Sequence, residues 1–263
     1  HQVVLIRPDH ASAHFNMANA LQEQGRLKEA IDAYTTALFI KPDYASALYN
    51  MGNAFQGLGE LEKAIEAYKK ALSIQPVFSK ALYNMGTTLQ GQGKLEEAIE
   101  AFNEALVISP DYAEAWNNMG SALQVQGKLQ EAVDAYKKAL FLKPDYAAAY
   151  NNVGNSLKEQ GKKIDAVTAY KKALNIKPNY DEAKTNLAIL LFENGEYGEA
   201  TKLFTKDISI NHQNFLLKCF YEQGEKDKFS KQLDYLIERG ESNAVIGSLI
   251  ARSAASFGLK QDN

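Results

Sequence analysis

The prolines of this chain recur at a fixed interval, which constrains the fold more than any other feature of the sequence. Each follows the last by 34 residues, at Pro8, Pro42, Pro76, Pro110, Pro144 and Pro178. Glycines recur with the same period, at Gly25, Gly59, Gly93, Gly127, Gly161 and Gly195. A globular domain does not space its chain-breaking residues so evenly. The sequence therefore predicts an array of similar units.

Each unit reads as two amphipathic helices separated by the glycine. Within a unit the apolar residues follow the helical period, as at Leu48, Met51 and Phe55. The glycine lies between two such stretches, where a residue that tolerates positive φ ends the first helix. The proline follows the second stretch, because a helix cannot continue through it. We therefore expect a helix, a turn, a second helix and a stop in every unit.

Small residues recur on both helices of a unit. In the first helix they are Ala18, Gly52, Gly86, Gly120, Gly154 and Ala188, and in the second Ala30, Ala64, Ala98, Ala132, Ala166 and Ala200. We expect these two rows to oppose each other, so that the antiparallel helices approach closely. A further alanine, such as Ala37, stands three residues after an aromatic, such as Tyr34. This alanine is expected to lie where one helix pair packs against the next.

The small residues, glycine, aromatic and proline at these offsets resemble the tetratricopeptide repeat (TPR). The resemblance implies an all-α, right-handed superhelical solenoid of helix-turn-helix repeats with a divergent helical C-terminal cap. We expect six repeats, at residues 11–44, 45–78, 79–112, 113–146, 147–180 and 181–214. The end of a truncated preceding repeat is expected at 1–10, and divergent capping helices with a polar tail at 215–263.

The last repeat departs from the pattern. Asp207 and His212 stand where the other repeats carry the small residue and the proline. Beyond it, Gly224 takes a turn position, and helical stretches are expected near 212–223, 226–238 and 243–257. A solenoid must cover its last apolar face with elements whose outside is polar. We therefore expect the chain beyond residue 214 to act as the cap.

Charge and composition exclude several classes of partner and cofactor. A net charge of −3 disfavours a nucleic-acid partner. The lone Cys219 forms no internal disulfide and no cysteine-based zinc site. His10 and His14 could share a helix face, but no third metal ligand is evident. No apolar run approaches the roughly 18 residues of a membrane span. We expect a cytoplasmic protein without metal, cofactor or membrane contact.

No motif of the sequence predicts catalysis. An active site needs a few reactive groups that differ from their surroundings, whereas here the polar residues recur with the repeat. Glycine pairs such as Gly57 with Gly59 follow no strand and precede no Lys-Ser or Lys-Thr, so they predict no phosphate loop. Lysine pairs on the second helices indicate a solvated face, with ion pairs expected between Glu66 and Lys70 and between Asp134 and Lys138.

The most informative pattern is a row of amides on the first helices. Asparagine occupies one position in all six repeats, at Asn16, Asn50, Asn84, Asn118, Asn152 and Asn186. One turn later stand Asn19, Asn53 and Asn155, joined by Gln22, Gln56, Gln90 and Gln124. Asparagine costs a helix interior roughly 0.5 kcal/mol relative to alanine. A recurring asparagine therefore requires a structural or functional reason.

Two interpretations of this row stay open. A carboxamide can both donate to and accept from the backbone of an extended peptide without reading its side chains. The same amides could instead bond neighbouring helices, because buried amides must find a partner. Aromatic residues adjoin the row at Phe15, Tyr49 and Tyr83 and give way to Asn117 and Asn151. The N-terminal half is therefore expected to supply stacking and apolar contacts.

Relatives of known type suggest what such a row does. The lysine and arginine clamp with which some TPR proteins hold a C-terminal carboxylate is absent. The row is similar to the TPR region of O-linked N-acetylglucosamine transferases, which implies that it holds an extended segment of a partner protein in a concave groove. The leading hypothesis is a non-catalytic interaction module. The alternatives are the substrate-recruiting region of a larger enzyme (a glycosyltransferase, oxygenase or sulfotransferase) and a homo-oligomeric scaffold that assembles through exposed repeat ends.

Overall fold

The chain is all-α in the computed structural model, which describes residues 10–204, 210–240 and 244–257. Fifteen helices and no strand make up this part of the chain. The all-α, helix-turn-helix architecture expected from the sequence is therefore confirmed for the described residues. Asp207 and all but the last residue of the expected truncated repeat at 1–10 lie outside them.

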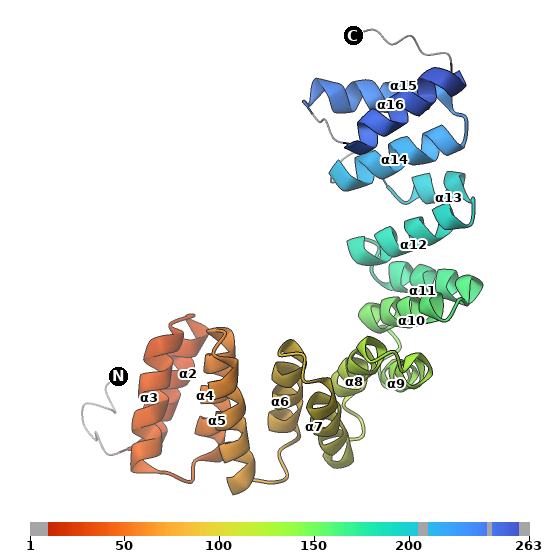
Figure 1. The fold of residues 1–263 in the computed structure, drawn as a ribbon. Coiled ribbons are helices and arrows are strands. Elements are labelled where there is room, and N and C mark those ends of the chain that lie inside the picture. The colour runs from red at the N-terminus through yellow and green to blue at the C-terminus, as the bar shows by residue number, and fades with distance from the viewer. Residues whose placement is uncertain (1–9, 205–209, 241–243, 258–263) are drawn as a thin grey trace. The chain divides into compact units, whose positions relative to one another are not determined.

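The first of two compact units extends to Asp145 and contains four helix pairs. In chain order these helices are α2 (Ala11–Glu23), α3 (Leu27–Ile40), α4 (Ala45–Gly57), α5 (Leu61–Ile74), α6 (Ser79–Gly91), α7 (Leu95–Ile108), α8 (Ala113–Val125) and α9 (Leu129–Leu142). Each first helix packs against the second helix of its own pair, and each second helix packs against the next first helix (Figure 1). The unit is thus a stack of helix pairs without long-range crossings.

The second unit begins at Tyr146 and starts with the same kind of pair. Its helices are α10 (Ala147–Glu159), α11 (Lys163–Ile176), α12 (Asp181–Glu193), α13 (Tyr197–Lys202), α14 (Ile210–Glu222), α15 (Lys226–Glu238) and α16 (Ala244–Phe257). The divergent last repeat shows in α13, which has 6 residues where α11 has 14. The last three helices enclose a separate apolar cluster that includes Phe229, Leu236 and Ile246.

The glycine between the two helices of each pair adopts the left-handed conformation, as the sequence predicts. Gly25 has φ +75° and Gly59 has φ +76°, and Gly224 in the last part of the chain has φ +69°. At the first turn Arg26 N–H donates to Leu21 O at 2.9 Å and Gly25 N–H to Gln22 O at 2.9 Å. This Schellman pattern satisfies carbonyls at the helix end that would otherwise lack donors.

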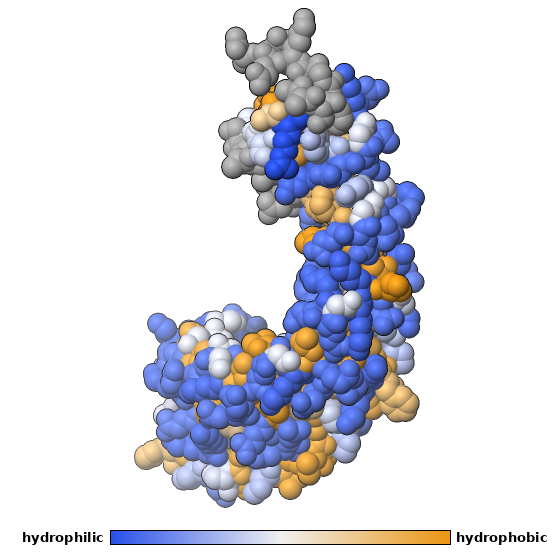
Figure 2. Space-filling model, turned by 45° about the vertical axis from the view of Figure 1, so that its right-hand side comes forward, coloured by the Kyte–Doolittle hydropathy of each residue, from blue (hydrophilic) through white to orange (hydrophobic). Residues whose placement is uncertain are grey.

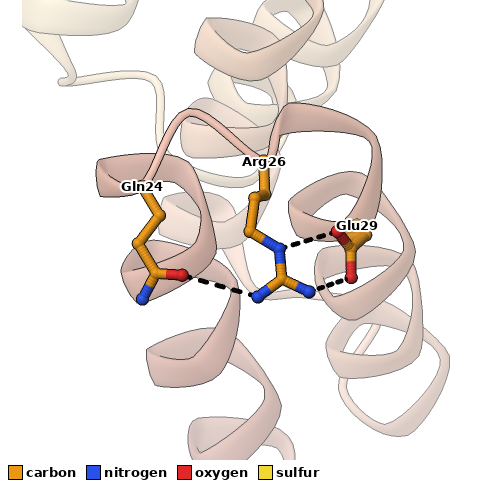
Figure 3. Close-up of polar contacts among 3 residues, drawn as sticks. All are labelled: Gln24, Arg26 and Glu29. Carbon is orange, nitrogen blue, oxygen red and sulfur yellow. Dashed lines mark hydrogen bonds and ion pairs between the residues drawn. The ribbon is translucent and has the colours of Figure 1, made fainter.

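Side chains reinforce the first of these turns. Arg26 donates its Nε–H to Glu29 Oε1 at 2.7 Å and also bonds the second oxygen of the same carboxylate. Its guanidinium reaches back to Gln24 Oε1 at 3.5 Å (Figure 3). Because all three side chains are exposed, the glycine geometry rather than this surface network determines the turn.

An aromatic ring of the second helix packs directly on the backbone of the first. A Cβ added at Gly120 would lie 2.7 Å from Tyr136 Cε1, and one added at Gly52 would lie 2.5 Å from Tyr68 Cε1. The ring, and not the second-helix alanine that the sequence analysis paired with the small residue, is therefore its nearest neighbour. The second-helix alanines are themselves fully buried.

The hydroxyls of these buried tyrosines reach the amides of the first helix. Tyr34 is fully buried, and its hydroxyl lies 2.6 Å from Asn19 Oδ1 and 2.8 Å from Gln22 Oε1. Burial raises the pKa of Tyr34 to about 12, since the charged phenolate would lose its hydration. The phenol therefore stays protonated in the folded chain well above its usual pKa.

We expect Gly120→Leu to lower the free energy of unfolding by about 1–3 kcal/mol, because the added side chain must displace the Tyr136 ring. Chemical denaturation of the variant beside wild type measures the change. Gly91→Leu is the matched control, since no atom lies within 4 Å of a Cβ at that exposed position. Equal stability of the two variants would contradict this account of the interface.

We also expect the chain to lose stability in alkali as the tyrosines ionise. A folded-state pKa of about 12 for Tyr34 lies above the ordinary value of about 10. Its contribution is therefore complete below pH 10 and declines as the pH rises towards 12. Denaturation curves at pH 8, 10 and 11 should show a smaller decline for Tyr34→Phe than for wild type. A decline of the same size in both chains would refute the assignment to this phenol.

Candidate functional site

The candidate site is the amide row, by which we mean Asn16, Asn50, Asn84, Asn118, Asn152 and Asn186. These residues lie on α2, α4, α6, α8, α10 and α12, the first helices of the successive pairs. Asn16 is exposed and the others are half-buried. The helical period fixes their common position within each pair, because every first helix begins at the same offset from its turn glycine.

The N–H groups of Asn50 and Asn84 bond the preceding repeat. Asn84 Nδ2 donates to Asn53 Oδ1 at 2.8 Å and to Tyr49 Oη at 3.1 Å. Asn50 Nδ2 donates to Asn19 Oδ1 at 2.8 Å. These bonds connect neighbouring first helices, so the structural interpretation of the row holds for its donors.

The same arrangement recurs in the second unit with a different partner. Asn186 Nδ2 donates to Asn155 Oδ1 at 3.0 Å and to Asn151 Oδ1 at 3.1 Å. Asn151 occupies the position of Tyr49, so its carbonyl oxygen replaces the tyrosine oxygen as acceptor. Asn151 is fully buried and also donates to Glu182 Oε1 at 2.9 Å.

The amides one turn later act as junctions. Asn53 Oδ1 accepts from the Tyr68 hydroxyl at 2.8 Å as well as from the row. Asn155 Oδ1 accepts from Tyr170 at 2.8 Å, and Gln56 Oε1 lies 3.1 Å from the Tyr68 hydroxyl. One carboxamide oxygen thereby ties together a second helix, its own first helix and the next first helix.

The third repeat lacks this junction. Thr87 and Phe102 stand where the second repeat has Asn53 and Tyr68. Asn118 Nδ2 instead donates to Tyr83 Oη at 3.0 Å. Gln90 has no tyrosine hydroxyl beside it, because Phe102 replaces the tyrosine, and it donates its Nε2–H to Ser121 Oγ at 3.1 Å. The connection between repeats is therefore kept by other side chains.

The carbonyl oxygens of the row form fewer hydrogen bonds within the fold than its N–H groups do. In the part of the chain that the structure describes, neither Asn50 Oδ1 nor Asn84 Oδ1 accepts a hydrogen bond. The Asn118 oxygen accepts from Asn117 Nδ2 at 3.2 Å. Asn84 has committed both of its N–H groups within the fold. Asn84 can therefore offer a ligand an acceptor, and not the paired donor and acceptor expected from the sequence.

The aromatics beside the row pack within their own repeats, each against the aromatic residue that ends the repeat. The ring centroids of Phe15 and Tyr44 lie 4.8 Å apart. Those of Tyr49 and Phe78 lie 4.9 Å apart, and those of Tyr83 and Tyr112 lie 4.7 Å apart. All three first-helix rings stay half-buried, so part of each ring can contact a ligand.

Sequence reasoning missed the tyrosine hydroxyls and the buried asparagines as members of this network. The hydroxyl of Tyr34 bonds an asparagine fifteen residues earlier, as do those of Tyr68 and Tyr170. The third repeat pairs Phe102 with Thr87, so tyrosine and asparagine are lost together there. This pairing within the chain was a usable signal. Tyr136 weakens it, since Ser121 stands at the corresponding position.

Other kinds of site find no support among the described residues. No group of three or more His, Cys, Asp and Glu side chains there could hold a metal ion. No helix in these parts of the chain is both long and apolar enough to span a membrane. Figure 2 shows a largely hydrophilic face on which apolar side chains form separate patches.

Comparison with solved structures places the fold among TPR proteins. MamA is 25% identical with a TM-score of 0.60, covering 65% of this chain and 94% of its own. YrrB, described as a TPR protein with an unusual peptide-binding site, is 24% identical with a TM-score of 0.60, covering 69% and 94%. A TPR protein from Parabacteroides merdae is 20% identical with a TM-score of 0.67, covering 92% and 97%. No curated protein matches the sequence.

A family model covers most of the chain. It describes the C-terminal domain of cilia and flagella-associated protein 70, a TPR domain, and it matches residues 4–225. The match spans all six repeats expected from the sequence and runs into the capping helices. The helix pairs, their left-handed turn glycines and this match agree: the chain belongs to the TPR family of the cilia and flagella-associated protein 70 C-terminal domain.

Proposed function

We propose that the chain is a protein-interaction module that holds an extended segment of a partner protein along the amide row, in a groove lined by the first helices. One observation carries the proposal. The N–H groups of Asn50 and Asn84 bond the preceding repeat, while their carbonyl oxygens accept no hydrogen bond among the described residues. A held carboxamide presents its oxygen in a fixed direction, which lowers the entropic cost of binding.

An acceptor row selects for the N–H groups of a partner backbone. First helices that touch lie about 8–10 Å apart. Three residues of a chain in the extended polyproline II conformation span about 9 Å and complete one turn, so every third N–H group points the same way. One backbone N–H in three can therefore meet one oxygen of the row, with the half-exposed edges of Phe15, Tyr49 and Tyr83 contacting the side chains between. Recognition of this kind depends little on the partner's sequence.

The comparisons support the same class of function. YrrB is described as having a peptide-binding site, and its fold matches over most of its length. The proposed partner is a protein and not a nucleic acid, since the chain carries a net charge of −3. We place this module in the cytoplasm. The same row would also serve the alternative function, in which the chain is the substrate-recruiting region of a larger enzyme.

We expect the triple variant Asn50→Ala, Asn84→Ala and Asn118→Ala to lose both stability and peptide affinity. Each lost bond between repeats costs about 0.5–1.5 kcal/mol, offset by about 0.5 kcal/mol of helix propensity. A peptide selected by display against the wild-type chain provides the ligand, and calorimetric titration beside thermal melts measures both effects. Asn103→Ala is the control, because Asn103 is an exposed asparagine on the second helix α7. Unchanged affinity in the triple variant would end the proposal.

The acceptor geometry makes a separate prediction about the peptide. Methylating one backbone nitrogen of the selected peptide removes one N–H donor and leaves its side chains intact. Affinity should fall by roughly fivefold, about 1 kcal/mol, at positions recurring every third residue. Methylation elsewhere should have a smaller effect. No loss at any position, or a loss without any period, would show that the row does not bind backbone donors.

A further inference from the structure

A second surface lies on the opposite side of the fourth repeat. A pocket of about 400 Å³ opens between α8, α9 and the loop before α8, and is lined by Pro110, Trp116, Lys137, Lys138, Phe141 and Leu142. Trp116 and Asn118 are two residues apart on α8, which separates them by about 200° around the helix. The pocket therefore faces away from the amide row.

The indole of Trp116 forms a fixed wall of this pocket. Its Nε1–H donates to Pro110 O at 3.0 Å. The ammonium group of Lys138 lies 4.1 Å from the ring centroid, within the range of a cation–π interaction. The hydrogen bond fixes the plane of the ring, and the ammonium group lies at the edge of the cavity.

Neither lysine of the pocket has an acidic partner among the described residues. Glu66 and Lys70 form the expected ion pair at 2.7 Å on α5. The corresponding pair on α9 was predicted and is not formed, because Asp134 accepts from Gln130 at 3.1 Å while Lys138 turns to Trp116. In the described part of the chain, neither Lys137 nor Lys138 has an ion pair. Two positive charges therefore stand unneutralised at one rim.

The same crevice two repeats earlier shows what is particular to the fourth repeat. A pocket of about 380 Å³ there includes Pro42, Leu48, Lys70, Ser73 and Ile74 at the equivalent positions. The crevice itself thus follows from the packing of repeats. In the second repeat, however, leucine replaces tryptophan, serine replaces phenylalanine, and the lysine is already paired. In the third repeat Glu104 stands at the position of Lys138.

The phenyl ring of Phe141 completes the pocket from the solvent side. Its side chain is 86% exposed, although Leu142 and Trp116 beside it are partly covered. Aromatic residues are enriched in protein–protein interfaces, so an exposed phenyl ring beside a tryptophan is a suitable contact for a partner. The volume of about 400 Å³ lies near the lower end of the range for ligand pockets, which starts at about 300 Å³. The pocket therefore has room for one or two side chains of a partner.

We propose that this pocket binds an acidic peptide segment of a partner protein, with one bulky apolar side chain between Trp116 and Phe141 and flanking carboxylates at Lys137 and Lys138. The occupant follows from charge complementarity. The chain as a whole carries a net charge of −3, so an acidic segment is attracted only where lysines lack an acidic partner, as Lys137 and Lys138 do among the described residues. Binding is expected to weaken as ionic strength rises.

The test uses the fluorescence of Trp116, which is the only tryptophan of the chain. The probe is a blocked synthetic peptide with one central leucine and two glutamates on each side, titrated into the full chain. We expect a saturable change in emission. Peptides with alanine for the leucine, or lysines for the glutamates, should bind at least tenfold more weakly. Equal binding of either reference peptide, or no saturable change, would overturn the proposal.

Variants taken from the chain's own repeats test the residues. Phe141→Ser introduces the residue of the second repeat and Lys138→Glu that of the third, both at exposed positions where the fold tolerates them. Each should weaken the probe about tenfold or more. Lys69→Glu makes the same charge change outside the pocket and should have little effect. Losses equal to that of Lys69→Glu would refute a role for the pocket.

Two further titrations separate this proposal from its rivals. Vesicles of anionic phospholipid should give no saturable response from Trp116, and a response to vesicles without one to the peptide would favour a membrane surface and overturn the proposal. The triple alanine variant of the amide row should bind the probe as wild type does. Loss of probe binding there would assign the peptide to the row. The proposed function and this inference therefore fail independently.

Discussion

The rest of each repeat depends on the close packing of one aromatic ring against the backbone of the facing helix. Tyr68 lies so near Gly52 that a single added carbon would clash with its ring. This approach carries the phenol hydroxyl to the amides of the first helix, where it bonds Asn53. Asn53 in turn accepts from Asn84 of the next repeat. Packing within a repeat and connection between repeats are thus consequences of the same contact.

This chain of contacts changes how the amide row is understood. From the sequence, a structural and a functional role for Asn84 appear as alternatives. In the structure its N–H groups serve the fold, while its carbonyl oxygen accepts no bond among the described residues. A carboxamide has separate donors and acceptor, so the two roles occupy different atoms of one side chain. Stability and binding then become coupled, and only substitutions or ligands that separate donor from acceptor can distinguish them.

The sequence predicts features that are local and periodic. Gly25 must adopt positive φ wherever the chain reverses after one helix, and the turn positions and helix stretches follow from that constraint. The ring that packs on Gly120 was not predicted, because helical periodicity gives the face of a residue but not the side chain that crosses from the facing helix. Lys138 shows the same limit. Its spacing from Asp134 allows an ion pair, but its ammonium group lies 4.1 Å from the ring centroid of Trp116 on another helix instead.

The surface carries two kinds of candidate binding site, one whose side chains recur with the repeat and one whose side chains do not. The amide row recurs in every repeat, so it can follow a backbone but cannot distinguish one partner sequence from another. The pocket lined by Trp116 and Phe141 differs in its side chains from the equivalent crevice of the second repeat, and such a difference can recognise a particular side chain of a partner. Two weak contacts on one partner reinforce each other through effective concentration, provided that the segment between them is long enough to pass from one face to the other. Under the two proposals, affinity would come from the recurring oxygens and selectivity from the pocket of the fourth repeat.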